Sequence, residues 1–338
     1  MKAALALALA LSLAALAVTD GAAHAAVSRQ DTPIAPALDV IQIQPNFYMI
    51  AGAGGNIGVQ FGPDGVVVVD TGNAESASAV LAAIRALTPL PIRYIINTAD
   101  DDHHVGGNEI LARGGESLFT GGNFGPGGAN NTIINNAGAA SIVGTDNMAL
   151  RFGGAAGEPS RYSSVASPTE TFARRQKAIY LNNEGIQIIR QTAHTDGDAI
   201  VLFRRSDVIV TGDIFDMTHF PVIDLERGGS IQGEIDALNA MVDLAIPSIP
   251  LPWKSGGTIL IPGHGRLAQH AELVEYRDMV TIIRDRIQDM INSRMTLDEI
   301  KAASPTKGWS HRFGAGSGPW TTDLFVEAIF KSLTAKKA

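Results

Sequence analysis

Residues 92–107 read IRYIINTADDDHHVGG. The first five residues, apolar except for Arg93, are typical of a buried strand. This strand leads directly into Asn97-Thr98 and then into three aspartates and two histidines, Asp100 to His104. So many carboxylates and imidazoles within a few residues are costly to pack unless water or a cation compensates their charge. The segment therefore indicates either a solvated acidic loop or part of a metal site.

Three further polar segments follow apolar, strand-like runs. They contain His194 (Thr-Ala-His-Thr-Asp-Gly-Asp, 192–198), Asp213 (Thr-Gly-Asp, 211–213) and His264 (Ile-Pro-Gly-His-Gly, 261–265). Alone, each has an ordinary structural explanation: a loop histidine, a helix cap or a turn residue. All four segments lie just beyond the C-terminal ends of predicted strands, however, and a layered α/β sheet gathers such positions at one edge. Their coincidence favours a shared site.

The rest of the chain predicts an α/β domain with helices layered on sheets. Residues 66–69, four consecutive valines, predict another buried strand. Helices are expected at 74–87, 230–244, 268–293 and 322–332. Residues 121–167 are rich in Gly, Asn, Ala and Ser and predict an irregular insertion with one helix near 142–152. Such a long loop is either a substrate-covering lid or a passive surface excursion.

The N-terminus has the pattern of a secretory signal peptide. Met1-Lys2 precedes an apolar run of Ala and Leu from Ala3 to Val18, and Ala23-His24-Ala25 places small residues where a signal peptidase reads them. The run is short for a membrane span, although an uncleaved anchor is the alternative. We therefore expect a signal peptide at 1–25, export to the periplasm or the medium, and no membrane attachment after cleavage. The mature chain is expected to form a single domain, 26–338, that ends in helices.

Composition narrows the chemistry. The chain has 338 residues, is 45% hydrophobic and carries a formal net charge of −8. It therefore has material for a large core and lacks the basic character of a general nucleic-acid binder, so we expect a small-molecule substrate and no nucleic-acid partner. It contains no cysteine, which excludes disulfides, cysteine nucleophiles and iron–sulfur clusters. Any metal must be held by histidine and carboxylate groups. The sequence does not indicate the oligomeric state.

The order of the four polar segments resembles the metallo-β-lactamase superfamily. The typical loop of that family reads Asn-Thr-His-x-His-x-Asp-His-x-Gly-Gly, and His-Thr-x-Gly-Asp, a Gly-Asp strand end and a Gly-His-Gly turn follow it. The resemblance covers about Asp39 to Ala303, and residues 220–224 and 228–231 are similar to an exported branch of the superfamily. It implies an αββα sandwich with metal in a cleft at one edge of the two sheets.

The chain departs from the family pattern in the first loop. With Asn97-Thr98 and residues 105–107 aligned without insertion, the family's two leading histidines fall on Ala99 and Asp101 and its aspartate falls on His103. The resemblance then implies one site made of His103, His104, His264 and Asp213. It also implies a depleted site made of Asp101, His194 and Asp213. A different register, with Asp102-His103 as the family's Asp-His pair, would need a compensating insertion.

The resemblance implies a metal-dependent hydrolase in which a metal-activated water attacks a small ester, a lactone or a β-lactam-like substrate. We expect one zinc ion on His103, His104, His264 and Asp213. A second ion at the depleted site is less favoured, and its harder ligands would also suit manganese or iron. Asp101 or Asp102 is expected to orient the water as a general base. Because two imidazole positions are lost, the alternative is a degenerate family member that binds a ligand or partner without turnover.

Overall fold

The computed structural model describes residues 37–118, 138–154, 159–249 and 256–335. All of them belong to one compact unit, residues 35–338. The predicted signal peptide, 1–25, and its cleavage site lie outside the described residues, so export and the 26–338 domain boundary stay predictions. Among the helices of the described residues, none is long and apolar enough to cross a membrane.

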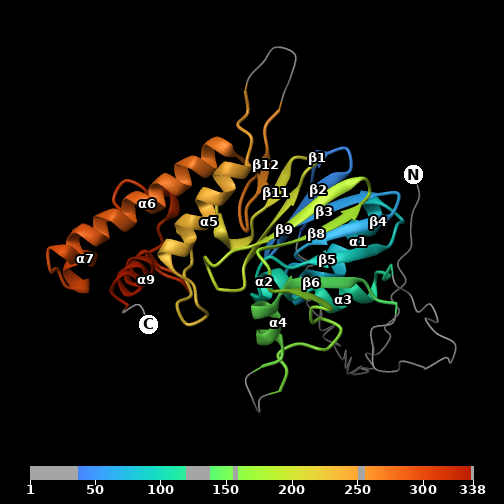
Figure 1. Ribbon diagram of the computed structural model, residues 1–338, viewed down its shortest axis with the longest axis horizontal. Coiled ribbons are helices and arrows are strands. Elements are labelled where there is room, and N and C mark those ends of the chain that lie inside the picture. Colours follow the sequence, from blue (N-terminus) through green and yellow to red (C-terminus); the bar gives the residue numbers. More distant parts are fainter. Residues whose placement is uncertain (1–36, 119–137, 155–158, 250–255, 336–338) are drawn as a thin grey trace, which may run out of the picture. The chain divides into compact units, whose positions relative to one another are not determined.

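Two sheets form the centre of this unit (Figure 1). The first has seven strands in sequence order: β1 (Asp39–Gln44), β2 (Phe47–Ala53), β3 (Gly55–Gly62), β4 (Gly65–Val69), β5 (Ile92–Ile96), β6 (Ser141–Thr145) and β7 (Glu170–Phe172). Pairing is antiparallel from β1 to β4 and parallel from β4 to β7. The predicted strands at 66–69 and 92–96 are therefore β4 and β5, in the middle of the sheet.

The second sheet is formed by the C-terminal half of the chain. Its six strands run in the order β13-β12-β11-β10-β9-β8. They are β8 (Gln176–Leu181), β9 (Glu184–Arg190), β10 (Ala199–Phe203), β11 (Val208–Val210), β12 (Ile259–Ile261) and β13 (Ala268–Gln269). All neighbours are antiparallel except β11 and β12, which run parallel. Because β11 and β12 point the same way, the residues that follow them emerge at the same edge of the sheet.

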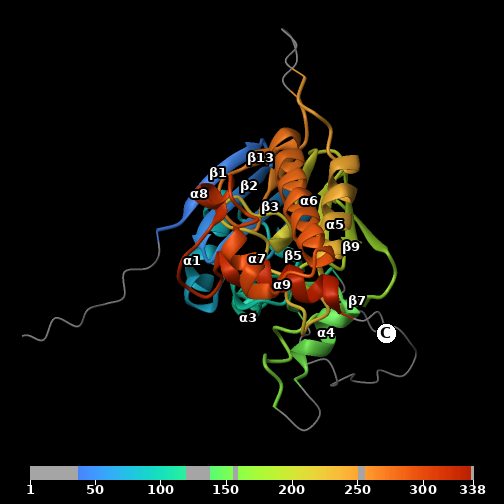
Figure 2. The same cartoon turned by 90° about the vertical axis from the view of Figure 1, so that its left-hand side faces the viewer.

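The two sheets pack face to face, and helices cover their outer faces. Val67 and Val69 of β4 pack towards the second sheet, whereas Val66 and Val68 pack under α1 (Ala77–Leu87), as the two-residue period of a strand requires. The outer face of the second sheet is covered by α5 (Ile231–Leu244), α6 (His270–Asn292) and α9 (Thr322–Thr334). Figures 1 and 2 show these layers from two directions. The predicted αββα sandwich is confirmed.

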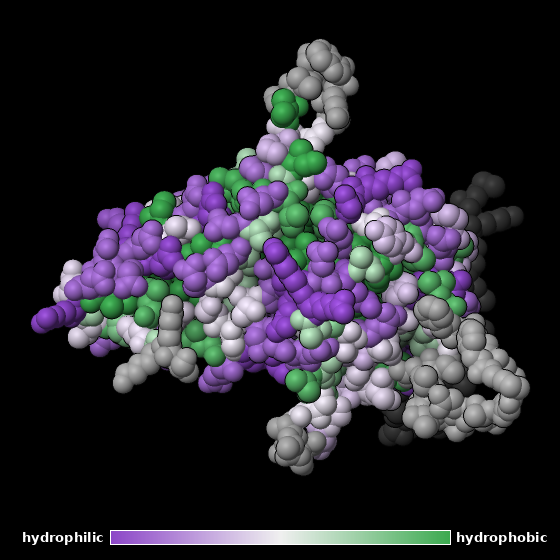
Figure 3. Space-filling model, viewed as in Figure 1, coloured by the Kyte–Doolittle hydropathy of each residue, from purple (hydrophilic) through white to green (hydrophobic). Residues whose placement is uncertain are grey.

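Shorter helices complete the described structure. They are η1 (Ala74–Ser76), α2 (Asp102–Val105), α3 (Asn108–Arg113), α4 (Asp146–Phe152), η2 (Gly212–Ile214), α7 (Leu297–Ala303) and α8 (Ser310–Phe313). Figure 3 shows mainly hydrophilic residues on the visible face around α6 and α7. This agrees with the one-sided apolar pattern of residues 268–293, whose apolar positions are buried against the second sheet.

The described part of the predicted insertion is more regular than expected. Residues 141–145 form strand β6, which lies parallel to β5, so the helix predicted near 142–152 begins only at Asp146. The side chain of Thr145 caps this helix by accepting a hydrogen bond from the Met148 backbone N–H at 3.2 Å. The apolar pair Ile142-Val143 belongs to a buried strand, because a short apolar run does not distinguish a strand from a buried helix.

Candidate metal centre

The four polar segments meet at one edge of the sheets. The Asp101–His104 segment follows β5, His194 follows β9, Asp213 lies in η2 after β11, and His264 follows β12. Ligand atoms from two sets of predicted residues lie within 4.8 Å of one another: His103, His104 and Asp213, and Asp101, His194 and Asp213. A third set, Asp216, His219 and His264, contains two residues that the sequence analysis did not single out. The structure thus brings together all six predicted metal-binding residues, and only His264 falls in a different group from the predicted one.

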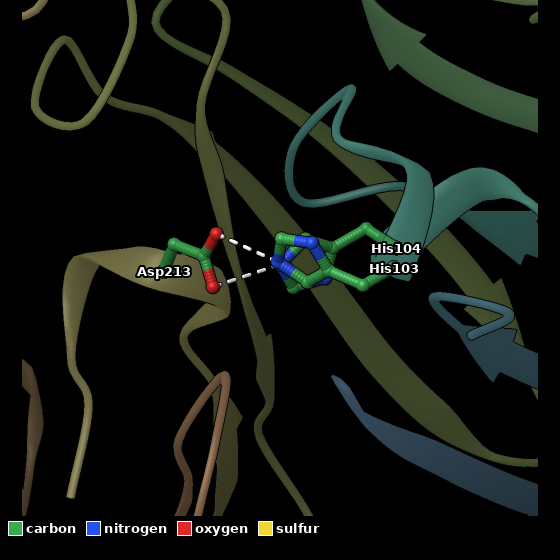
Figure 4. Close-up of side chains that lie close together, drawn as sticks. All are labelled: His103, His104 and Asp213. Atoms are coloured by element: carbon green, nitrogen blue, oxygen red, sulfur yellow. Dashed lines mark hydrogen bonds and ion pairs between the residues drawn. The ribbon is translucent and has the colours of Figure 1, made fainter. Parts of the chain in front are cut away.

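His103 and His104 point from α2 towards the carboxylate of Asp213 (Figure 4). Nε2 of His103 lies 3.0 Å from Oδ2 of Asp213, and Nε2 of His104 lies 2.9 Å from Oδ1. His264 is more distant, with its Nε2 3.5 Å from Oδ1 of the same aspartate. Ligands that surround zinc at about 2.0–2.2 Å stand roughly 3–3.5 Å from one another. The spacing of these donor atoms therefore fits a divalent metal ion.

The hydrogen bonds around His104 give a second test of this fit. Nδ1 of His104 lies 2.9 Å from Oδ2 of Asp70, so this nitrogen donates its proton to the carboxylate. Nε2 then presents a lone pair towards Asp213. Although only 2.9 Å separates them, Nε2 of His104 and Oδ1 of Asp213 are buried and make no well-directed hydrogen bond within the described residues. At this distance the buried nitrogen and oxygen need a positive charge between them, supplied either by a proton on the ring or by a metal ion. A second carboxylate behind the histidine is the usual support of a metal ligand.

Electrostatics favour positive charge at this position. Burial opposes charge on His104, but the carboxylates of Asp213 and Asp70 outweigh it and raise the pKa of His104 well above 6.5. Burial alone would raise the pKa of Asp213, but His104 and His103 outweigh burial and hold this pKa well below 3.8. Without metal, protons would supply the positive charge. With metal, the same carboxylates attract the ion.

The depleted site is organised differently. Nε2 of His194 lies 3.0 Å from Oδ2 of Asp101, and Nδ1 lies 2.9 Å from the carbonyl oxygen of Val222. Both ring nitrogens therefore face acceptors, and although burial works against it, the hydrogen bond with Asp101 and nearby carboxylates raise the pKa of His194 to about 10. Nη2 of Arg227 donates to Oδ1 of Asp101 at 2.8 Å and lies 3.3 Å from Nε2 of His194. Ligand atoms of Asp101, His194 and Asp213 also lie close enough together to hold an ion, but here the guanidinium of Arg227 already supplies positive charge beside Asp101 and His194.

Arginines compensate the negative charge of the acidic loop. Each aspartate of the loop pairs with an arginine from a later segment: Asp100 with Arg151, Asp101 with Arg227 and Asp102 with Arg161. These partners are not predictable from the sequence, because pairing between distant loops depends on the tertiary fold. The only signal was the excess of negative charge itself.

The two predicted catalytic carboxylates occupy different surroundings. Asp101 uses one oxygen for His194 and the other for Arg227, and although burial opposes it, these partners hold the pKa of Asp101 well below 3.8. Asp102 is exposed and is bonded to Arg161 and to the hydroxyl of Tyr162. It belongs to none of the three groups of candidate ligands. This placement gives no support to the register in which Asp102-His103 is the family's Asp-His pair.

Asp70 is a further residue that the sequence analysis did not include in the site. It directly follows β4 with a positive φ of 63°, and its carboxylate accepts hydrogen bonds from the backbone N–H and the hydroxyl of Thr98 at 2.8 and 2.5 Å. The loop after β5 is thereby anchored to the end of β4. Oδ2 of Asp70 also accepts a hydrogen bond from Nδ1 of His104. The Asp70 carboxylate therefore both shapes the loop and orients a candidate ligand.

Comparison with known proteins agrees with this fold. Residues 51–116 match the model of the metallo-β-lactamase superfamily. This segment contains Asp70 and the loop with Asp101, His103 and His104. A search of curated protein sequences finds no match.

Solved structures with the same fold include two kinds of protein. The stereoselective inverting sec-alkylsulfatase Pisa1 from Pseudomonas sp. aligns with a TM-score of 0.59 at 14% identity over 87% of this chain and 50% of its own. This chain thus spans about half the length of the alkylsulfatase. A metallo-β-lactamase from Pontibacter korlensis aligns with a TM-score of 0.52 at 14% identity, covering 72% of this chain and 99% of that one. The DIM-1 metallo-β-lactamase aligns with a TM-score of 0.50 at 15% identity, covering 73% and 98%.

At these identities the structural likeness shows the fold alone, and fold does not decide function. The family match adds the segment that carries the first loop of the candidate site. Residues 51–116 thus match the metallo-β-lactamase superfamily, and the described part of the chain has the αββα fold that solved metallo-β-lactamases share.

Proposed function

We propose that the chain is a metal-dependent hydrolase that binds one zinc ion on His103, His104 and Asp213, with His264 beside them, its Nε2 3.5 Å from Oδ1 of Asp213. The observation that carries this proposal is the buried pair of acceptors, Nε2 of His104 and Oδ1 of Asp213, which lie 2.9 Å apart without a hydrogen bond. Imidazole nitrogens with one carboxylate are a ligand set that zinc accepts readily.

Some residues around this position orient the candidate ligands, and others leave the position open to solvent. A zinc ion held there would lower the pKa of a bound water and polarise an oxygen of the substrate. Asp70 holds His104 in one tautomer, and both residues are fully buried. His103 and His264 remain partly exposed, with 33% and 25% of their side chains accessible. Substrate therefore approaches from the side of His103 and His264.

Arg227 is the second electrostatic element of the proposal. Its guanidinium lies beside Asp101 and His194, and 24% of its side chain is accessible. A fixed cation next to the reacting centre attracts an anionic substrate and stabilises negative charge that develops on an oxygen. In this account Arg227 supplies, at the depleted position, part of the positive charge that a second ion would supply.

The expected role of Asp101 or Asp102 as a general base finds little support. Both oxygens of Asp101 are engaged by His194 and Arg227, and its low pKa makes it a weak base. Asp102 is turned towards Arg161 and Tyr162 at the surface. We therefore assign Asp101 the role of orienting Arg227 and His194.

The substrate class that we propose is a small ester, lactone or β-lactam, attacked by water at an acyl carbon. Sulfate esters join the panel because one similar fold is that of an alkylsulfatase. The signal-peptide pattern of residues 1–25 supports export, and with it an extracellular or periplasmic small molecule as the partner. The alternative remains a family member that binds a ligand without turnover, and the closed depleted position is the observation in its favour.

The test is a hydrolysis panel with zinc-loaded protein that begins at Ala26, with His103→Ala as the matched variant. The panel contains aryl esters, lactones, β-lactams and a secondary alkyl sulfate. Turnover of at least one class that falls by a factor of about 100 or more in the variant supports the hydrolase. Binding of a panel compound without turnover, in protein that retains its zinc, supports the alternative.

A further inference from the structure

Two members of the third group of candidate ligands lie on the loop that follows η2, and the third follows β12. Asp216 and His219 come from this loop, and their ligand atoms lie within 4.8 Å of one another and of a ring nitrogen of His264. Neither residue corresponds to a ligand position in the four segments that carry the family resemblance. As at His104 and Asp213, a histidine ring nitrogen faces a buried carboxylate oxygen that has no hydrogen-bond partner in the described residues.

Asp216 presents one carboxylate oxygen to the loop and the other to the cluster. The side chain is fully buried. Its Oδ1 accepts hydrogen bonds from the backbone N–H and the hydroxyl of Thr218, at 2.5 and 2.6 Å, and from the backbone N–H of His219 at 3.0 Å. Its Oδ2 has no hydrogen-bond partner within the described residues. A buried carboxylate oxygen without a partner costs free energy unless a cation or water satisfies it.

His219 is oriented so that its lone pair faces that oxygen. Nδ1 of His219 lies 2.9 Å from the carbonyl oxygen of Phe220, which can only accept, so Nδ1 carries the proton. In the neutral ring Nε2 is then an acceptor. It lies 3.2 Å from Oδ2 of Asp216 without a well-directed hydrogen bond. This tautomer, with Nδ1–H on a backbone carbonyl, is the usual one for a metal-binding histidine.

His264 connects this cluster to the first one. Its Nε2 is 3.5 Å from Oδ1 of Asp213, and its ring lies 4.9 Å from that of His103 and 5.7 Å from that of His219, centroid to centroid. At the depleted position, in contrast, the charge of Asp101 is already neutralised by Arg227. Apart from Asp213, the carboxylate of this edge that keeps a buried oxygen without a partner in the described residues is therefore Asp216, not Asp101.

We propose that Asp216, His219 and His264 form a second divalent-cation site, next to the ion on His103, His104 and Asp213. Two imidazole nitrogens and one carboxylate oxygen suit zinc, and an open fourth position is left for water or a substrate oxygen. The site extends the same centre as the proposed function, but it stands on Asp216 and His219, which that function does not use. Its rival is a metal-free ion pair between Asp216 and a protonated His219.

Asp216→Asn is the sharpest variant for the test. The asparagine oxygen retains the three hydrogen bonds that shape the loop, and the amide can donate to Nε2 of His219, so the fold is preserved while the anionic ligand is lost. His219→Ala is the second variant, because a third of its side chain is exposed. His103→Ala removes the first site, and His311→Ala, on an exposed residue of α8, is the control. Circular dichroism checks the fold of each protein.

The readout is zinc per chain by elemental analysis after loading with zinc chloride and removal of excess metal. We expect about two ions in wild type and His311→Ala, and about one in Asp216→Asn, His219→Ala and His103→Ala. Wild-type zinc content in both Asp216→Asn and His219→Ala overturns the second site, whatever His103→Ala does. A loss confined to those two variants, with His103→Ala unchanged, supports the second site and overturns the ligand assignment of the proposed function.

Discussion

Nη2 of Arg227 lies 2.8 Å from Oδ1 of Asp101, the residue that stands where the family pattern has its second histidine. The chain has exchanged an imidazole for a carboxylate there and has placed a guanidinium against it. Burial works against the charge of Arg227, but Asp101 and Asp224 more than offset this and raise its pKa above the ordinary value of 12.5. The position therefore carries permanent positive charge without metal.

Replacing Arg227 by methionine leaves Asp101 and His194 without their cation. In metal-free protein we expect a loss of about 2 kcal/mol in the free energy of unfolding, because a partly buried carboxylate loses a charged hydrogen-bond donor. Added zinc should then stabilise Arg227→Met more than wild type, since Asp101 and His194 become free to bind an ion. Urea unfolding with and without zinc measures both effects. An equal response to zinc in the two proteins contradicts the assignment of Arg227.

The buried pair of Asp100 and Arg151 is expected to contribute more to the free energy of unfolding than the exposed pair of Asp102 and Arg161. Arg151 binds both oxygens of the buried Asp100 at 2.8 and 3.0 Å. Breaking such a pair by Arg151→Ala should cost about 3 kcal/mol in the free energy of unfolding. Arg161→Ala, which breaks an exposed pair with Asp102, should cost less than about 1 kcal/mol. Equal losses in urea unfolding would be inconsistent with the structure.

The sheet edge could be predicted from the sequence, because a strand end appears locally as an apolar run followed by polar residues. The valine run at 66–69 and the apolar run at 92–96 became adjacent parallel strands, and the histidines after β9 and β12 reached the same edge. The three-and-four spacing of residues 268–293 likewise became the long helix α6. The strand at 141–145 was mistaken for helix, since a run of that length carries no decisive period.

The partners inside the site were not predictable in the same way. Whether Asp101 binds a metal or an arginine depends on where Arg227 falls in three dimensions, and nothing local to either residue indicates it. The tautomers of His104 and His219 depend on Asp70 and on the carbonyl of Phe220. His264 was assigned to the group of His103 and His104, but its ring nitrogen groups with Asp216 and His219. The partner and the tautomer of each site residue are therefore determined by tertiary contacts.

Asp70→Asn should weaken zinc binding, and circular dichroism must check its fold because one amide oxygen cannot accept from both His104 and the Thr98 backbone N–H. The asparagine can still accept the proton of His104, but it lacks the charge that polarises the ring. Loss of such a supporting carboxylate lowers metal affinity by roughly 10- to 100-fold. Competition with a zinc chelator measures the affinity, and Asp243→Asn, at an exposed position of α5, serves as the control. Unchanged affinity in Asp70→Asn would separate Asp70 from the metal site.

Glu234 predicts a specific pH dependence of stability. Both of its carboxylate oxygens are buried without a hydrogen-bond partner in the described part of the chain. Burial, and next the carboxylate of Asp198, raise the pKa of Glu234 well above 4.5. Because the folded state keeps the proton that the unfolded state releases, this residue's contribution to stability is greatest below pH 4.5 and falls as the pH rises towards the folded-state pKa.

Glu234→Gln removes this titration and keeps the shape of the side chain. We expect the variant to exceed wild type in the free energy of unfolding at pH 8 and to match it near pH 4. Chemical denaturation across this pH range gives the difference directly. A difference that stays constant with pH would show that Glu234 is not held in its neutral form.

The most direct test of the account is anomalous scattering at the zinc edge from crystals of zinc-loaded wild-type protein. We predict a peak at bonding distance from Nε2 of His103, Nε2 of His104 and the carboxylate of Asp213. A peak between Asp101 and His194, with Arg227 displaced and no density beside His103 and His104, would contradict the central assignment. So would the absence of any peak at this edge of the sheets.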